Sequence, residues 1–223
     1  MKKPSFIIFI LLLTTKISAQ TEYGIRAGIS YATMMGTDVA LFNVVDDTGA
    51  EIGTKGKTGY NVGVYLRKPI SKNLFLRPEL AVATRGIANQ EAIFRGYDAK
   101  FYRYNFTYID LPILLQIGNA EGGFYIFTGP QFSYLLNAQR KLENERIEME
   151  EIIGEKPSSM AVFGVFGGAY ELPSGLNISI RAEYGLTKIA KETKANMLSL
   201  NASLGFHISN ARRFGAKSLR RFY

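Results

Sequence analysis

Apolar and polar residues alternate strictly along two neighbouring stretches near the carboxyl end of the chain. In residues 176–187, leucine, isoleucine, alanine and tyrosine occupy every second position, and polar or small residues occupy the positions between them. The same pattern returns in residues 198–208 after a short polar break. Successive side chains of a β-strand point to opposite faces, so a period of two over this length predicts extended strands. Two such strands in succession predict an antiparallel hairpin with one apolar and one polar face.

Alternation also recurs earlier in the chain, although it is weak in the glycine-rich residues 160–172. We expect further strands over residues 23–30, 60–67, 74–83, 108–117, 124–137 and 160–172, which brings the number to eight. The connections after the first, third and fifth strands are predicted to be long, at residues 32–57, 86–101 and 138–158, whereas those after the second, fourth and sixth are tight turns. Residues 138–158 are the most charged segment, and their apolar residues have a loose helical spacing that is compatible with a helical excursion.

An even number of antiparallel strands, with tight turns at one end and long loops at the other, is typical of outer-membrane barrels. Alternation alone would also fit a soluble sandwich or a lipocalin-like cup. Lysine placement favours the membrane, because every lysine after residue 19 lies at a predicted strand end, in a loop or in the tail, whereas a soluble sheet carries lysine along its exposed strands. The predicted fold is therefore one all-β domain, an eight-stranded antiparallel up-and-down transmembrane β-barrel. Its apolar faces would meet lipid, its turns would be periplasmic and its long loops would be outside.

Such a barrel would enclose several charged residues of the polar faces. The interior of an eight-stranded barrel is just wide enough for side chains to fill, and unpaired charges there are costly. We therefore expect arginine–carboxylate pairs and a plugged interior without a conducting pore. Residues of opposite charge two positions apart on one strand face are interpreted as members of this network rather than as active pairs. The predicted interior network, a structural one, comprises Arg26, Arg67, Arg77, Glu79, Asp110, Gln131, Arg181 and Glu183.

Aromatic residues near the predicted strand ends are compatible with the girdles of membrane barrels. Packing in a core explains many of them equally well. The candidates are Tyr23, Tyr60, Tyr104, Phe124, Tyr184 and Phe206.

The amino terminus predicts export. Two lysines precede an apolar run, Phe6 to Leu13, which is too short for a spanning helix of about 20 residues. Small and polar residues follow up to Ala19, and together these features are typical of a secretory signal peptide. We expect residues 1–19 to be the signal peptide, residues 20–208 the barrel domain and residues 209–223 a basic tail.

Composition narrows the chemistry further. The chain has no cysteine and a net charge of +8, so it relies on neither disulfides nor thiolate metal sites. In an exported chain, the basic tail favours anionic lipid or a partner protein over nucleic acid. A solvated tail is an equally good interpretation.

Candidate catalytic groups are few. The sole histidine, His207, is expected on the inward face of the last strand at the periplasmic rim, away from surface substrates, and is interpreted as a structural polar residue. Asp46 and Asp47 are adjacent, so their side chains would diverge or be solvated. The acids of residues 143–155 are interpreted as a solvated loop rather than a cation site. No phosphate-binding glycine loop or metal-ligand spacing occurs, and we expect no catalytic residue, no metal and no cofactor.

Five short motifs, several of which contain proline, are distributed along most of the chain after the signal peptide. They are Tyr-Gly-Ile-Arg-Ala-Gly from residue 23, Leu-Arg-Pro-Glu-Leu from residue 76, Tyr-Ile-Asp-Leu-Pro-Ile-Leu-Leu from residue 108, Thr-Gly-Pro-Gln from residue 128 and Leu-Pro-Ser-Gly-Leu from residue 172. In these motifs the chain resembles the PorT-like outer-membrane β-barrel proteins. The resemblance implies an eight-stranded membrane barrel and accounts for prolines that the central strands of a soluble sheet would disfavour.

The same resemblance implies no catalytic mechanism, and the namesake of the family is associated with type IX protein secretion. The tail after Ile208 departs from members that end on an aromatic residue closing their last strand. Phe206 and Tyr223 are therefore alternative assembly signals.

The sequence thus predicts a non-enzymatic outer-membrane barrel that acts through its long loops as a scaffold, a surface-interaction protein or a secretion-associated component. Expected partners are outer-membrane lipid, with lipopolysaccharide or secretion-system proteins as further candidates, and no nucleic acid; we expect a monomer. Two alternatives stay open: a small-ligand or lipid binder or enzyme at the barrel mouth, and a soluble periplasmic β-cup. A mouth site would bring loop carboxylates onto Arg85, Arg95 or Arg103, whereas scattered charges favour the scaffold.

Overall fold

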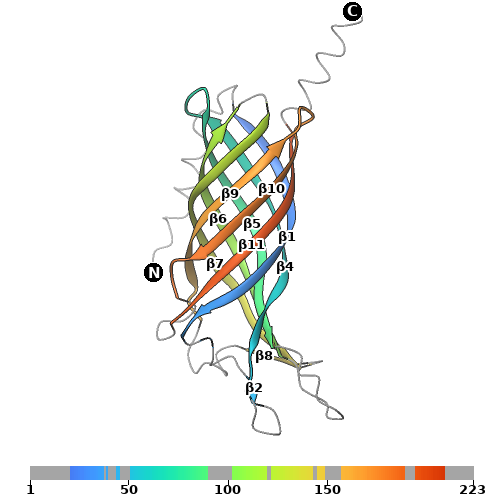
Figure 1. Ribbon diagram of the computed structural model, residues 1–223, viewed down its shortest axis with the longest axis vertical. Coiled ribbons are helices and arrows are strands. Elements are labelled where there is room, and N and C mark those ends of the chain that lie inside the picture. The colour runs from blue at the N-terminus through green and yellow to red at the C-terminus, as the bar shows by residue number, and fades with distance from the viewer. Residues whose placement is uncertain are drawn as a thin grey trace, which may run out of the picture.

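The computed structural model describes residues 21–37, 39, 44–45, 51–89, 102–119, 122–142, 145–148, 157–188 and 194–208 of the 223-residue chain. The predicted signal peptide and basic tail lie outside these residues, as do Asp46, Asp47 and Arg95. Eight long strands form the barrel of Figure 1: β1 (Glu22–Gly36), β4 (Thr54–Pro69), β5 (Leu74–Asn89), β6 (Tyr102–Gly118), β7 (Gly123–Leu142), β9 (Met160–Glu171), β10 (Leu176–Gly185) and β11 (Ala195–His207). Three short strands lie in the long connections: β2 (Val44–Val45), β3 (Glu51–Ile52) and β8 (Glu145–Glu148).

The barrel is a closed meander. Each barrel strand pairs antiparallel with the barrel strands next to it in sequence, and β1 pairs with β11 from Gly24↔His207 to Gly36↔Ala195 to close the ring. Closure gives the backbone N–H and C=O groups of every strand a neighbour, which hydrocarbon surroundings require. The predicted eight-stranded antiparallel up-and-down barrel is confirmed.

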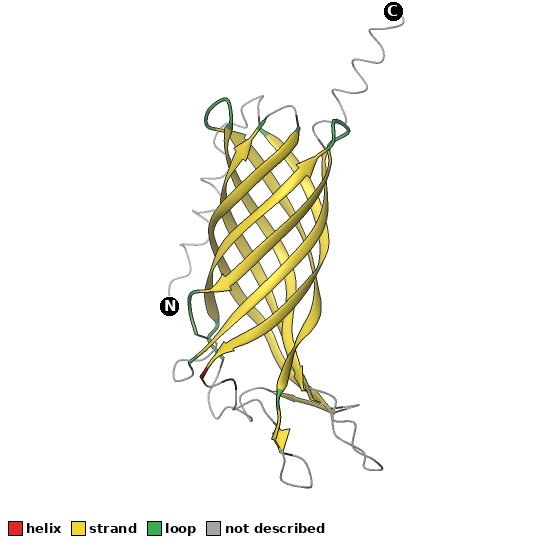
Figure 2. Ribbon diagram, viewed as in Figure 1, coloured by secondary structure: helices red, strands yellow, loops and turns green. Residues whose placement is uncertain are grey.

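The two ends of the barrel differ, as Figure 2 shows. Residues 70–73 and 172–175 connect strands by short turns at one end, and at the same end β6 stops at Gly118 and β7 begins at Gly123. The turn before β10 is closed by a hydrogen bond from the Gly175 N–H to the Leu172 carbonyl, 2.9 Å, and needs the positive φ of Gly175 (89°). The long connections between β1 and β4, β5 and β6, and β7 and β9 all leave from the other end.

Several strands extend further toward the long loops than the side-chain pattern predicted. The structure shows β1 continuing to Gly36, β4 beginning at Thr54 and β5 ending at Asn89, so the irregular stretches predicted from Ala32 and from Gly86 are wrong for these residues. The backbone ladder continues because hydrogen bonds between strands do not depend on which side chains alternate.

The helical excursion predicted within residues 138–158 is also wrong where the structure describes that segment. Residues 138–142 continue β7 and pair with β6, and β8 folds back on β7 with Gln139 opposite Glu148. Pairing with an existing sheet outweighs a loose helical spacing of apolar residues. Residues 143–144 and 149–156 lie outside the described part.

The apolar face of the sheet points outward. Ile180 is 66% exposed and Leu204 is 57% exposed on the outer surface, whereas Arg181 and Glu183 are 1% and 2% exposed inside. The predicted orientation of the two faces is therefore confirmed. One aromatic candidate for the girdle is wrong: Tyr104 is buried inside, because even-numbered residues of this part of β6 face inward.

Candidate functional site

The interior of the barrel, which we call the lumen, carries charges of both signs in equal number. Among the described residues, the positively charged ones are Arg26, Arg67, Arg77, Arg85 and Arg181. The negatively charged ones are Glu22, Glu79, Asp110, Glu171 and Glu183. All are buried except Glu22, whose side chain is 13% exposed. A buried charge is costly unless it is paired and hydrogen-bonded, so an even balance is what a filled lumen requires.

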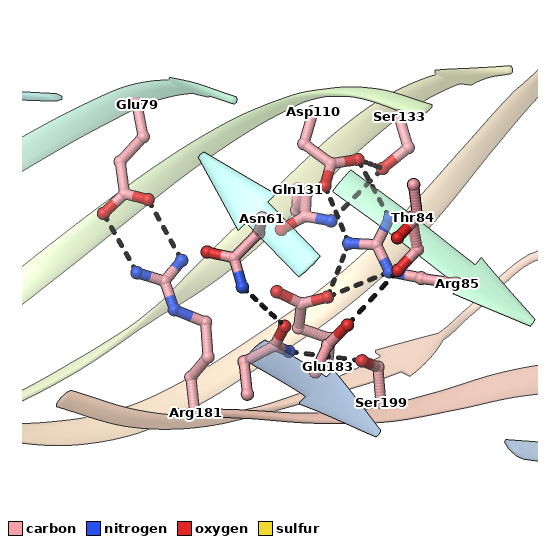
Figure 3. Close-up of polar contacts among 12 residues, drawn as sticks. Asn61, Glu79, Thr84, Arg85, Asp110, Gln131, Ser133, Arg181, Glu183 and Ser199 are labelled. Carbon is pink, nitrogen blue, oxygen red and sulfur yellow. Dashed lines mark hydrogen bonds and ion pairs between the residues drawn. The ribbon is translucent and has the colours of Figure 1, made fainter. Parts of the chain in front are cut away.

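Glu79 is the centre of the first ion-pair cluster. Its carboxylate lies 2.8 Å from the Arg26 Nε of β1, 2.9 Å from the Arg77 Nε of β5 and 3.0 Å from the Arg181 Nη1 of β10. The Arg181 contact is bidentate and is drawn in Figure 3. Arg26 also donates to the Asn61 side chain. Three guanidinium groups therefore share one carboxylate.

Arg85 is the centre of the second cluster, closer to the long-loop end. Its Nη2 lies 2.7 Å from Asp110 Oδ2 and 2.6 Å from Glu183 Oε2, as Figure 3 shows. The Ser133 hydroxyl donates to Asp110 (2.6 Å), and Gln131 Nε2 donates to Ser133 (3.2 Å). The cluster thus joins four strands: β5, β6, β7 and β10.

A third cluster lies at the short-turn end. Arg67 Nη1 is 2.7 Å from Glu171 Oε2 and Arg67 also pairs with Glu22. His207 is fully buried beside it, with its Nδ1 3.1 Å from the Tyr65 hydroxyl and 3.5 Å from Glu171 Oε1. Its position is the inward face of β11 at the short-turn end.

Aromatic rings fill the space between the charges. The Arg77 guanidinium lies 4.1 Å from the ring centre of Tyr65 and 5.7 Å from that of Phe127. Toward the long loops an apolar cap closes the lumen over Arg85; it consists of Met34, Ile87, Tyr104, Phe106, Tyr108, Phe163, Ala195 and Met197. Arg85 itself contacts the rings of Tyr108 and Phe163. Cation–π contacts of this kind stabilise desolvated arginines.

All eight residues of the predicted interior network are buried in the lumen. The structure adds Arg85, Glu171, Glu22, Asn61 and Ser133, which the sequence pattern does not assign to the network. A signal existed for Arg85, because it continues the odd-numbered inward series of Arg77 and Glu79 on the same strand. The sequence pattern instead ends the predicted strand at residue 83 and makes Arg85 a candidate residue of a mouth site.

The structure also bears on the arrangement expected of a mouth site. Arg85 binds two strand carboxylates inside the lumen rather than loop carboxylates, and Arg103 is exposed on β6. Within the described ranges, no three His, Cys, Asp or Glu side chains are grouped as metal ligands. A helix long and apolar enough to cross a membrane is likewise missing from the part of the chain that the structure describes.

Comparison with known proteins finds a match to one family model. The model, described as an outer membrane protein beta-barrel domain, matches residues 18–191. No curated protein sequence matches the chain.

Solved structures with a similar fold include three outer-membrane proteins. Neisserial surface protein A is 12% identical, with 82% of this chain and 96% of that chain covered and a TM-score of 0.49. Ail of Yersinia pestis, in complex with the heparin analogue sucrose octasulfate, is 12% identical, with coverages of 85% and 99% and a TM-score of 0.46. OprG from Pseudomonas aeruginosa is 12% identical, with coverages of 84% and 95% and a TM-score of 0.41.

Proposed function

The chain belongs to the outer membrane protein β-barrel domain family, and from this premise we propose that it is a plugged, non-enzymatic barrel that serves as a scaffold for its long outer loops. It is a protein of the bacterial outer membrane. Within that membrane its role is that of a surface-interaction or secretion-associated component of the PorT-like kind.

The observation that carries the proposal is the set of ion pairs across the lumen. β5 and β10 are separated by three barrel strands in either direction around the ring, so they are opposite walls. Arg181 of β10 reaches Glu79 of β5, and Arg85 of β5 reaches Glu183 of β10. Opening a channel would separate these buried pairs, and breaking one such pair costs about 3–5 kcal/mol. The lumen therefore favours an anchor over a pore.

The apolar cap supports the scaffold over a catalytic or ligand-binding mouth. It covers the Arg85 cluster with buried aromatic and aliphatic side chains, so these charged groups do not face the loops. A mouth enzyme would need acid–base groups within reach of a substrate. The carboxylates that bind Arg85 are instead buried below the cap.

The motifs that carry the PorT-like resemblance support the finer part of the proposal. Four of the five contribute a side chain to the lumen network: Arg26 from the first, Arg77 and Glu79 from the second, Asp110 from the third and Gln131 from the fourth. The motifs that carry the resemblance therefore also supply residues that fill the lumen of this barrel.

Planar-bilayer recording tests the plug. The refolded barrel, checked by heat-modifiable migration in gels, is expected to show no stable conductance. A large and steady conductance from folded protein would refute the scaffold role. In cells, deletion of the protein should reduce the amount of secreted cargo on the cell surface. An unchanged set of surface proteins in the deletion strain would refute the proposed secretion-associated role.

A further inference from the structure

A polar hollow of about 410 Å³ lies in the barrel wall at the long-loop end. Its lining comes from four adjacent strands, β4 to β7, and includes Lys57, Tyr60, Thr84, Asn105, Asn137 and Gln139. None of its lining residues belongs to the ion-pair clusters of the lumen. The proposed scaffold role does not involve this hollow.

The hollow lies where the outer surface changes from apolar to polar. On β6 the outward residues are apolar from Ile117 to Ile109, and the next two outward residues are Thr107 and Asn105. The eight steps from Ile117 to Ile109, at about 3.4 Å each and a tilt of about 40°, rise about 21 Å. Outer-membrane barrels present an apolar band about 25 Å tall, so the hollow is at the level of the lipid headgroups.

The neighbouring strands change character at the same level. On β5 Val82 is followed on the outer face by Thr84, and on β4 Val62 and Tyr60 are followed by Thr58. Tyr60 is 60% exposed at this boundary. The long loops mark the outside of the cell, so the leaflet that meets the hollow is the outer one.

Two irregularities in strand pairing bound the hollow. The β4–β5 register shifts between Gly56 and Asn61, and the β6–β7 register shifts between Thr107 and Tyr108. Such bulges redirect side chains and are enriched beside functional sites. The first bulge is held by Thr84, whose Oγ1 accepts a hydrogen bond from the Tyr60 N–H (3.0 Å).

The lining has the chemistry of a site for a phosphorylated sugar. Side-chain amides of Asn105, Asn137 and Gln139 can donate to and accept from hydroxyl groups. Tyr60 offers a ring face, and Lys57 a cation, whose ammonium donates to Asn105. The residues that line the hollow include no carboxylate, so nothing among them opposes a phosphate.

Two more cations lie next to the hollow on the same strands. Lys55 and Arg103 are exposed, and both pair in register with Ala88, which lies between them on β5. Charge-assisted hydrogen bonds from such groups to phosphate are about twice as strong as neutral ones. The positive charge is thus concentrated where a lipid phosphate would lie.

We propose that this hollow binds the phosphorylated sugar headgroup of an outer-leaflet glycolipid, whose acyl chains lie along the apolar outer face of β4–β7 below it. The inference rests on the outer-membrane location of the barrel and stands whether or not the barrel is a scaffold.

Binding of labelled lipopolysaccharide to the barrel in phosphatidylcholine nanodiscs tests the proposal. The variants are Lys57→Met and the double substitution Asn137→Leu with Gln139→Leu, which leaves the lysine in place. Lys68→Met is the matched control, because Lys68 is an exposed lysine of the same strand at its short-turn end. Heat-modifiable migration shows which variants have folded, and the β7 double variant carries the test if Lys57→Met does not fold.

We expect each of the two hollow variants to bind lipopolysaccharide about tenfold more weakly, from the loss of hydrogen bonds to a charged and polar headgroup, and Lys68→Met to bind like the wild type. Phosphatidylglycerol and inorganic phosphate should fail to compete. Unchanged affinity in folded hollow variants would overturn the proposal. Competition by phosphatidylglycerol as strong as that by lipopolysaccharide would reduce the site to a general anionic-lipid surface, and equal competition by phosphate would reduce it to an anion site; either result overturns the sugar specificity.

Discussion

Arg85 on β5 and Glu183 on β10 meet inside the barrel with 2.6 Å between Nη2 and Oε2. The same two strands are joined a second time in the opposite sense, by Arg181 and Glu79 at 3.0 Å. Since β5 and β10 are opposite walls of the ring, each pair ties the barrel across its lumen. The charged side chains therefore link opposite strands as well as filling the lumen.

Replacing Arg85 tests how much these ion pairs across the lumen stabilise the barrel. Arg85→Met leaves the Asp110 and Glu183 carboxylates buried without a guanidinium, so we expect the free energy of unfolding to fall by about 3–5 kcal/mol. Glu183→Gln should cost less, because Arg85 keeps Asp110 as its partner. The measurement is urea unfolding in lipid vesicles. Arg103→Met, at an exposed site on β6, is the control and should change stability by no more than about 0.5 kcal/mol; an Arg85→Met protein as stable as this control would contradict the account.

Two glycines of β9 test how tightly the lumen is filled. A Cβ at Gly167 would lie 2.6 Å from the Ile180 carbonyl oxygen and 2.6 Å from the Phe127 ring, whereas a Cβ at Gly164 would meet only a Leu186 methyl group at 4.0 Å. Gly167→Ala is expected to lower the free energy of unfolding by about 1–3 kcal/mol through overpacking. Gly164→Ala should be neutral or slightly stabilising, because alanine restricts the unfolded chain. Equal effects of the two substitutions on urea unfolding would show that the lumen has room to spare.

The bulge in β4 provides a third test. Thr84→Val removes the acceptor of the Tyr60 N–H at the barrel surface, and a typical hydrogen bond contributes about 0.5–1.5 kcal/mol net. Faster hydrogen exchange of the Tyr60 amide in the valine variant is the expected result. Thr84→Ser keeps a hydroxyl group and should exchange like the wild type. If valine and serine behave alike, the hydroxyl does not hold the bulge.

The sequence predicted the inside and outside of the barrel wherever alternation was strict. Arg77, Glu79 and Arg181 belong to runs in which every second residue is apolar, and a period of two leaves only one assignment of faces. Arg85 was missed because Thr84 and Gly86, its neighbours, are polar and small, so the pattern fades although the strand continues to Asn89. The pattern could not separate a girdle position from a core position for Tyr104, because residues 103–107 are mixed on both faces.

Partner choice across the lumen could not be predicted at all. Arg181 and Glu183 are neighbours on one strand face, yet each binds a residue of the opposite wall. Which walls face each other, and at what height, depends on strand tilt and stagger in the closed barrel. These quantities are properties of the whole ring rather than of any one strand.

The apolar side of each strand faces lipid, and the charged side faces the lumen. Because the chain has no cysteine, single cysteines can be placed along β11 at residues 200 to 204 and spin-labelled in a bilayer. The account predicts that collisions with oxygen dissolved in lipid are frequent at Leu200, Ala202 and Leu204 and rare at Asn201 and Ser203, whose native side chains face the lumen. The opposite alternation, or equal accessibility along the strand, would contradict it.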